Sequence, residues 1–225
     1  MESKTTIAIN LIQNLISFGT YICWQSKKAT ESNSKNLRAI DAGKQEVMSF
    51  VAVKVIDNGG ILVYPTDTIY GFGVNAKDSI AIDKLNSLKN RIGPISVIAP
   101  DSATVSTWLD VKEEEKLHAA SHLDAKNTII FPVKKNIVHK KIMGPDCTLG
   151  IRIPNHPFCK LIANSCSVPI TTTSVNRNGE PPRNNVKEIL NSFPTEIDLI
   201  IEDGDLVNSA SKIYRYTMDG LKNIR

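Results

Sequence analysis

The sequence lacks the cysteine and glycine patterns on which many small functional sites are built. Its four cysteines show no C-x-x-C spacing and no paired framework, which argues against a zinc ribbon or a disulfide scaffold. There is no P-loop and no G-x-G-x-x-G, so a bound nucleotide must be held in another way. His118 and His122 stand four residues apart, but HAASH lacks the glutamate of a metalloprotease helix. We therefore expect no protein metal site and a reducing, cytoplasmic compartment.

An uninterrupted hydrophobic span is also missing. Residues 6–24 are largely apolar, but Asn10, Gln13 and Asn14 interrupt them, and the segment is marginal in length for a bilayer. We expect an amphipathic helix packed on the domain, or a wrongly assigned start of the reading frame, and no membrane association. The polar residues 25–35 predict a linker. The chain then divides into an N-terminal extension and linker over 1–42 and one domain over 43–225.

Composition places that domain among ordinary globular proteins. Apolar residues make up 41% and charged residues 22% of the 225-residue chain, and this balance is typical of a folded α/β or α+β domain. The formal net charge of +4 is mildly basic. That charge favours ligands that carry phosphate, but it falls well short of a basic nucleic-acid-binding domain.

The stretch from Gly59 to Ala76, GGILVYPTDTIYGFGVNA, predicts a strand that ends in a polar loop. Pro65 cannot donate a hydrogen bond to a sheet, so the apolar strand 61–64 should end there. Hydroxyls and an acid then follow at the carboxyl end of the strand, where open α/β sheets bind their ligands. An ordinary strand-to-helix turn would use similar residues, so the pattern alone leaves the choice open.

Periodicity predicts alternating helices and strands, and thus an α/β fold with a twisted open mixed sheet and flanking helices. Two predicted strands carry polar side chains on one face: Thr148 and Arg152 flank Gly150, and Thr172, Ser174 and Asn176 alternate along the next strand. The predicted helices cover 45–57, 79–91 and 185–193, a further helix begins near Pro157 and includes Ile162, and residues 102–123 are predicted to be helical material. The predicted strands cover 61–64, 95–99, 128–133, 148–153, 170–176, 197–201 and 213–216.

Four short motifs, in a fixed order, resemble those of a known family. They are PTDTIYGFG from Pro65, the triplet Lys89-Asn90-Arg91, TLGIRIPNHP from Thr148, and TSVNRNG from Thr173. The order is similar to that of the YrdC-like family, with PTDTxYGLG, KxR, TxxxRxPxHP and TSANxSG. Ser211 and Arg225 give a weaker fifth match, spaced like the family's STxxD and final LR. The resemblance covers about residue 43 to the end of the sequence.

The resemblance implies both a fold and a reaction. YrdC-like threonylcarbamoyl-AMP synthases have a single α/β domain with a basic concave cavity. These nucleotidyltransferases join L-threonine and bicarbonate or carbon dioxide to a carbamate, which attacks the α-phosphate of ATP and releases pyrophosphate. The product serves the threonylcarbamoyladenosine modification of tRNA. Magnesium bound with ATP, contact with tRNA or double-stranded RNA, and a downstream threonylcarbamoyl-transfer complex are implied as well.

Site residues follow from the resemblance position by position. Lys89 and Arg91 are the implied catalytic pair and also contact ATP. Arg152 is implied to meet the carboxylate of threonine. If it lines an open cavity, it supports no buried network and its removal should leave folding nearly untouched, whereas if it ties strands together, its removal should lower the melting temperature. The residues implied for threonine are Thr68, Arg152, Thr172 and Ser211, and those for ATP are Lys89, Arg91, Thr148, Ser174, Asn176 and Arg225.

Several departures from the family pattern fall near the implied site. The loop after Arg91 is shortened, and Ile98 stands where many members carry a histidine. Leu123–Thr128 (LDAKNT) replaces PGPxT, and Lys212 replaces the threonine of STV. These changes leave open a diverged, non-catalytic module that binds double-stranded RNA or tRNA. A weaker alternative is another carbamoyl-adenylate reaction, as in hydrogenase-maturation carbamoyltransferases.

The placement of the basic residues discriminates between the two main hypotheses. A small nucleotide pocket requires Lys89, Arg91, Arg152 and Arg225 to converge on the row of hydroxyls. An RNA surface instead requires the lysines at 134, 135, 140 and 141 to gather on one outer face, because backbone binding needs many phosphate contacts.

Overall fold

The computed structural model describes residues 22–23, 42–217 and 219–225, with side chains from residue 47 onward. The predicted helix 6–24 and linker 25–35 lie outside these residues, except for Ile22–Cys23. Those two residues form strand β1 and are therefore not helical. Within the described residues, no helix has both the length and the apolar character needed to cross a membrane.

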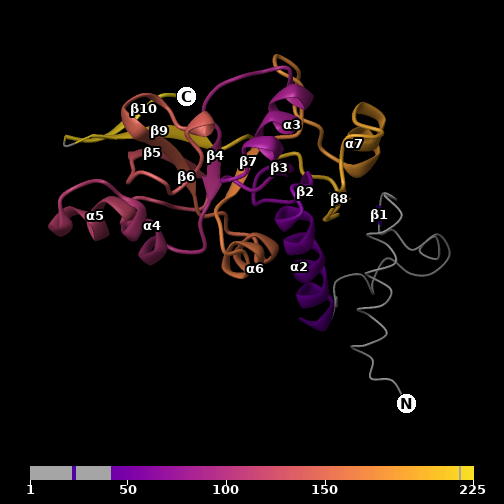
Figure 1. Cartoon of the computed structure of the whole chain (residues 1–225), viewed down its shortest axis with the longest axis horizontal. Helices are drawn as coiled ribbons and strands as arrows, with labels where there is room; N and C mark the ends of the chain where they lie inside the picture. Colours follow the sequence, from indigo (N-terminus) through magenta and orange to yellow (C-terminus); the bar gives the residue numbers. More distant parts are fainter. Residues whose placement is uncertain (1–21, 24–41, 218) are drawn as a thin grey trace.

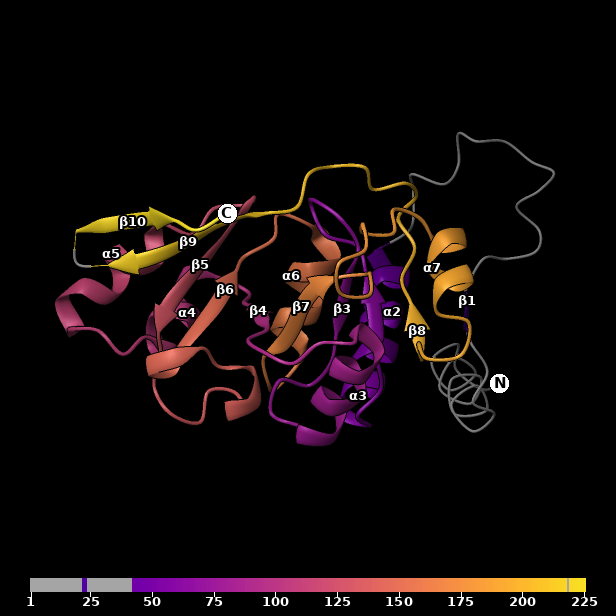
Figure 2. The same cartoon turned by 90° about the horizontal axis from the view of Figure 1, so that it is seen from above.

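The described residues form one mixed sheet with helices on both faces, which confirms the predicted α/β class (Figures 1 and 2). The strand order is β1-β8-β2-β3-β7-β4-β6-β5-β9-β10, with both parallel and antiparallel neighbours. The helices are α2 (Ala42–Asp57), α3 (Ser79–Lys89), α4 (Ser102–Trp108), α5 (Lys116–Ser121), α6 (Pro157–Ser165) and α7 (Val186–Ser192). The strands are β1 (Ile22–Cys23), β2 (Leu62–Tyr64), β3 (Gly71–Gly73), β4 (Ser96–Ile98), β5 (Asn127–Pro132), β6 (Thr148–Arg152), β7 (Ile170–Ser174), β8 (Leu199–Ile200), β9 (Lys212–Thr217) and β10 (Gly220–Asn223).

Local sequence signals account for several helix starts. The Asp78 side chain accepts hydrogen bonds from the backbone N–H groups of Ile80 and Ala81 and so caps α3. His156 caps α6 by accepting from the N–H of Phe158, and Pro157 occupies the first turn.

The sequence prediction is incomplete where tertiary pairing overrides periodicity. The helical material predicted over 102–123 is present but divided between α4 and α5, because Leu109 leaves α4 to form a β-bridge with Val133. Strand β3 was not predicted, since its Gly-Phe-Gly sequence has a low strand propensity. It forms because β2 and β7 supply partners on both sides.

Two hydrophobic clusters pack on opposite faces of the sheet. The first cluster contains residues of α3, α4, α5 and α7, and the second contains residues of α2 and α6. Because side chains alternate along a strand, Val63 belongs to the first cluster, and Leu62 and Tyr64 belong to the second. Ile98 and Ile170 belong to the second cluster. Their neighbours two residues along β4 and β7, Ser96 and Thr172, therefore lie on that same face, beyond the helices that cover it.

Candidate active site

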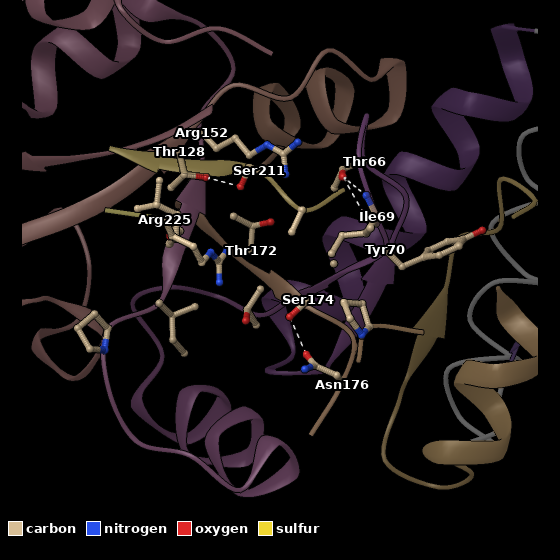
Figure 3. Close-up of a pocket in the computed structure, with 18 of the residues that line it drawn as sticks. Thr66, Ile69, Tyr70, Thr128, Arg152, Thr172, Ser174, Asn176, Ser211 and Arg225 are labelled. Carbon is tan, nitrogen blue, oxygen red and sulfur yellow. Dashed lines mark hydrogen bonds between the residues drawn. The ribbon is translucent and has the colours of Figure 1, made fainter. Parts of the chain in front are cut away.

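A cavity of about 550 Å³ lies on the face of the sheet that α2 and α6 cover only in part. Its wall is formed by the PTDT loop, the loop after Arg91, strands β4 and β7, and the segment that leads into β9. Most of the wall groups are hydroxyls, arginines and short side chains (Figure 3). Because these groups come from segments far apart in the sequence, folding alone brings them together.

Glycines on two strands around this cavity leave room for neighbouring groups. A Cβ atom on Gly150 of β6 would lie 2.4 Å from the Oγ atom of Ser96 on the neighbouring strand β4, so a side chain at position 150 would displace Ser96. Gly71 lines the cavity directly. A Cβ atom on Gly73 would lie 2.8 Å from the Tyr64 ring, so this glycine makes room for a buried side chain.

The PTDT loop is fixed by one hydroxyl. The Thr66 Oγ1 atom accepts hydrogen bonds from the backbone N–H groups of Thr68 and Ile69 and donates to the Ile69 carbonyl at 2.7 Å. Thr66 lines the cavity, whereas Thr68 is buried, with its hydroxyl 3.0 Å from that of Thr66. The implied threonine ligand Thr68 thus lies one layer behind the wall and supports Thr66.

Arg152 lines the cavity, but it is also part of a buried ion pair. Its Nη2 atom lies 2.5 Å from the Asp67 Oδ1 atom, and the two side chains are 5% and 10% exposed. The same nitrogen donates to the Ala125 carbonyl at 3.4 Å. The expectation that Arg152 takes part in no buried network is wrong, because its removal would leave a buried carboxylate without its cation.

Arg91 closes its own shortened loop. The Arg91 Nη2 atom donates to the Pro94 carbonyl at 2.7 Å, and Gly93 supplies the positive φ of 146° that the tight turn requires. The guanidinium lines the cavity, and its burial lowers the pKa of Arg91. The short loop therefore still presents the arginine of the KxR motif to the cavity.

Lys89 is not among the residues that line the cavity. Its side chain is buried, and its Nζ atom donates to the Ser174 carbonyl at 2.5 Å, the Asn176 carbonyl at 2.8 Å and the Asn176 Oδ1 atom at 3.0 Å. Burial, with a smaller contribution from the charge of Arg91, lowers the pKa of Lys89 from 10.5 to about 7. Lys89 thus fastens the end of β7 to the end of α3.

The hydroxyl row predicted on β7 faces the cavity. Thr172, Ser174 and Asn176 all line it, and the Ser174 hydroxyl donates to the Asn176 Oδ1 atom at 2.6 Å. Thr148 behaves differently: its hydroxyl donates to the Pro145 carbonyl at 2.8 Å, and the residue is buried away from the wall. It lies on the same strand face as Arg152 but does not reach the cavity.

The C-terminal segment completes the wall. The hydroxyls of Ser211 and Thr128 lie 2.8 Å apart, and backbone hydrogen bonds join Arg225 to Ile213. In Figure 3, Arg152 and Ser211 lie at one end of the cavity, Ser174 and Asn176 at the other, and the Arg225 guanidinium points toward the space between them.

Tyr70 ties the PTDT loop to the segment before Ser211. The Tyr70 hydroxyl donates to the Gly204 carbonyl at 2.8 Å and accepts from the Asp203 N–H at 2.9 Å. Burial raises the pKa of Tyr70 to about 12, so the phenol stays protonated and remains a donor at neutral pH. Asp203 also bonds the His156 Nε2 atom at 3.0 Å, which links the cap of α6 to the same segment.

The structure therefore brings together most of the predicted site residues but not all of them. Lys89, Thr68 and Thr148 lie behind the wall. Two lining residues were not predicted from the sequence: Ser96, which lies beside Gly150, and Thr128, whose hydroxyl lies beside that of Ser211. The alternation of side chains along their strands is the signal that could have identified them. The predicted residues that line the cavity are Arg91, Arg152, Thr172, Ser174, Asn176, Ser211 and Arg225.

Carboxylates are scarce on this wall. Glu180 is the one among the lining residues, and its Oε2 atom already lies 2.6 Å from the Arg183 Nη2 atom. The described residues hold no group of three or more histidine, cysteine or acidic side chains that could bind a metal ion. This wall does not fit a resident magnesium ion, although magnesium that arrives with nucleotide phosphates needs no such cage.

Comparison with known proteins identifies the class. The model of the Sua5–YciO–YrdC family, described as telomere recombination, matches residues 54–225. A relative from Coxiella burnetii, named threonylcarbamoyl-AMP synthase, is 31% identical over 163 residues, which are 67% of this chain and 82% of that protein. The chain belongs to the Sua5–YciO–YrdC family.

Solved structures agree on the fold. Sua5 of P. abyssi complexed with L-threonine superposes with a TM-score of 0.72 at 23% identity, over 80% of this chain and 54% of that one. The chain thus spans about half the length of that Sua5 protein. HypF in a phosphate- and nucleotide-bound form has a TM-score of 0.69 at 24% identity, over 79% of this chain and 28% of that one.

Proposed function

We propose that the chain is an L-threonylcarbamoyladenylate synthase. The observation that carries the proposal is the convergence of Arg91, Arg152 and Arg225 with a row of hydroxyls on one cavity, in a chain whose relatives are named threonylcarbamoyl-AMP synthase. Such a wall suits ligands that carry carboxylate and phosphate groups. Its hydroxyls have no histidine or lysine among the lining residues to activate them as nucleophiles, so the proposed catalysis rests on positioning and charge neutralisation.

In the proposed reaction, the amine of threonine and bicarbonate form a carbamate and water. A carbamate oxygen then attacks the α-phosphate of ATP, and pyrophosphate leaves. Arg152, Thr172 and Ser211 bind the amino acid, and a protein of similar fold, Sua5 of P. abyssi, has been solved in complex with L-threonine. Arg91, Ser174, Asn176 and Arg225 bind ATP, which brings its magnesium with it as part of the substrate.

Lys89, Thr68 and Thr148 contribute to the proposed site from behind its wall. Lys89 holds Ser174 and Asn176 in place, and Thr68 contacts Thr66. Thr148 fixes the turn at Pro145 that precedes β6. We assign no direct substrate contact to these three residues.

The product would be a mixed anhydride, so an acceptor must consume it. We propose tRNA as that acceptor, through a separate threonylcarbamoyl-transfer complex, in the cytoplasm where the free thiols of Cys147, Cys159 and Cys166 stay reduced. The RNA-binding alternative is less well supported, because Lys134 donates to the Thr107 carbonyl and Lys141 pairs with Asp83. Two of its four lysines are thus engaged within the protein.

One assay tests the proposal. Purified full-length protein, ATP with magnesium, and bicarbonate are incubated with each amino acid, and pyrophosphate and the acyl-adenylate are measured. Threonine should give both products. Serine should bind less well by about 1 kcal/mol, or roughly fivefold, because it lacks one methyl group. Failure to form either product with any amino acid would refute the synthase and favour the RNA-binding module.

A further inference from the structure

The ion pair between Asp67 and Arg152 joins two elements that are distant in the sequence. Asp67 belongs to the loop after β2, and Arg152 is the last residue of β6. The Asp67 carboxylate is not on the cavity wall, whereas the Arg152 guanidinium is. The acid therefore contacts the arginine from behind, on the side away from any ligand.

The loop that carries Asp67 is a rigid support. The Thr66 hydroxyl bonds both backbone N–H groups that follow Asp67, and the Cys159 thiol donates to the Pro65 carbonyl at 3.2 Å. Because the backbone on both sides of Asp67 is held, its carboxylate has a fixed position. An arginine bonded to it is fixed as well.

Only part of the guanidinium is used within the protein. The Nη2 atom bonds Asp67 and the Ala125 carbonyl, while the Arg152 Nε and Asp67 Oδ2 atoms are buried without a hydrogen-bond partner among the described residues. A small rotation would let these two atoms meet and make the pair bidentate. In either arrangement Nη1 is the nitrogen that stays available to the cavity.

We propose that Asp67 is a positioning residue for amino-acid binding, which holds the Arg152 guanidinium so that its Nη1 edge faces the cavity before the ligand arrives. The proposal rests on the proposed function for the identity of the ligand. A preformed guanidinium loses less side-chain freedom when it binds a carboxylate. Asp67 would therefore raise the affinity for threonine without touching it.

Asp67→Asn is the sharpest test, because it keeps the size of the side chain and removes its charge. Glu196→Gln is the matched control, since Glu196 bonds Arg177 at 3.3 Å in another arginine–carboxylate pair whose residues do not line the cavity. Threonine affinity is measured by calorimetry, and the Michaelis constants for threonine and ATP are measured separately. The order of the Arg152 side chain is measured from its Nε–H resonance by ¹⁵N relaxation.

For Asp67→Asn we expect a threonine dissociation constant raised on the order of tenfold, an unchanged Michaelis constant for ATP, a turnover close to wild type at saturating threonine, and a mobile Arg152 side chain. Glu196→Gln should match the wild type in every measurement. A rigid Arg152 in Asp67→Asn, or a wild-type affinity for threonine in that variant, would overturn the proposal.

The wild type supplies a second test that does not depend on how the variant folds. Its Arg152 Nε–H resonance should be ordered without any ligand, and an arginine that becomes ordered only when threonine is added would overturn the proposal. A wild type that forms no product and binds no threonine refutes the proposed function instead. The two failures are thus distinguishable.

Discussion

The two ends of the cavity carry arginines in opposite electrostatic settings. Arg152 faces a buried carboxylate at 2.5 Å, so its charge is balanced within the protein. Arg91 and Lys89 donate to carbonyl and amide oxygens instead, and no hydrogen bond or ion pair among the described residues joins either of them to a carboxylate. The lowered pKa values of both groups reflect burial without a counter-ion.

This difference teaches which ligand each end fits. Because Asp67 neutralises the charge of Arg152, this arginine offers a ligand oriented hydrogen-bond donors but little net charge. Such a group suits a small amino acid whose own charges nearly cancel. Arg91, which has no carboxylate partner among the described residues, retains a positive field at the cavity, and that suits the several negative charges of a triphosphate. We therefore propose that the amino acid binds at the end of the cavity around Arg152 and that the phosphates of ATP bind around Arg91.

The largest effect is expected for Arg152→Ala. Breaking a buried pair by removing one partner costs about 3–5 kcal/mol, so the melting temperature should fall on the order of 10 °C, and threonine affinity should fall by one to two powers of ten. Arg152→Lys keeps a cation for Asp67, so it should melt closer to wild type and still bind threonine poorly. Thermal melts and calorimetry check both; normal threonine binding by Arg152→Lys would remove the arginine from the amino-acid end.

Arg91→Ala tests the proposed phosphate end of the cavity and should affect ATP but not threonine. Loss of a charge-assisted contact to phosphate costs about 1.5–3 kcal/mol, which corresponds to a Michaelis constant for ATP raised roughly ten- to a hundredfold. Threonine affinity should not change, because Arg91 bonds only its own loop. Steady-state kinetics with each substrate varied in turn measure this, and an equal effect on both substrates would contradict two separate ends.

An effect on stability alone, one that depends on pH, is expected for Lys89→Met. The pKa of Lys89 is about 7 in the folded protein against 10.5 when exposed, so the unfolded state binds more protons between these values and wild-type stability should rise with pH there. The slope is at most about 1.4 kcal/mol per pH unit. The free energy of unfolding of Lys89→Met should lack this rise, and parallel profiles for the two proteins from pH 7 to 10 would refute the lowered pKa.

The smallest effect is expected for a truncation that begins at Ala42. Helix α2 starts there, and the described part that is lost, β1, has only two residues at the edge of the sheet. The shortened protein should stay folded and keep its turnover. Aggregation or lost activity, measured beside the full chain, would place the N-terminal segment within the core and shift the predicted boundary at residue 42.

The fold class and the position of the site were predictable because they depend on local signals. Pro65 ends the strand before the polar loop, and strand alternation put Thr172 and Ser174 on one face. The family was predictable from the order of four motifs and is confirmed over residues 54–225.

What could not be predicted depends on long-range packing. The sequence gives no sign that Asp67 meets Arg152 across 85 residues. Nor does it show that Lys89 turns to the carbonyls of β7 instead of the cavity. The motifs indicate which residues lie near the site. Whether each side chain lines the cavity or is buried behind its wall depends on hydrogen-bond and ion-pair partners that are distant in the sequence.

The separation of the two ends is tested most directly by one calorimetric titration of L-threonine into the wild type, Arg152→Lys and Arg91→Ala, run side by side. We predict that Arg152→Lys loses one to two powers of ten in affinity and that Arg91→Ala binds threonine as the wild type does. The reverse pattern, with threonine binding lost in Arg91→Ala and kept in Arg152→Lys, would contradict the account.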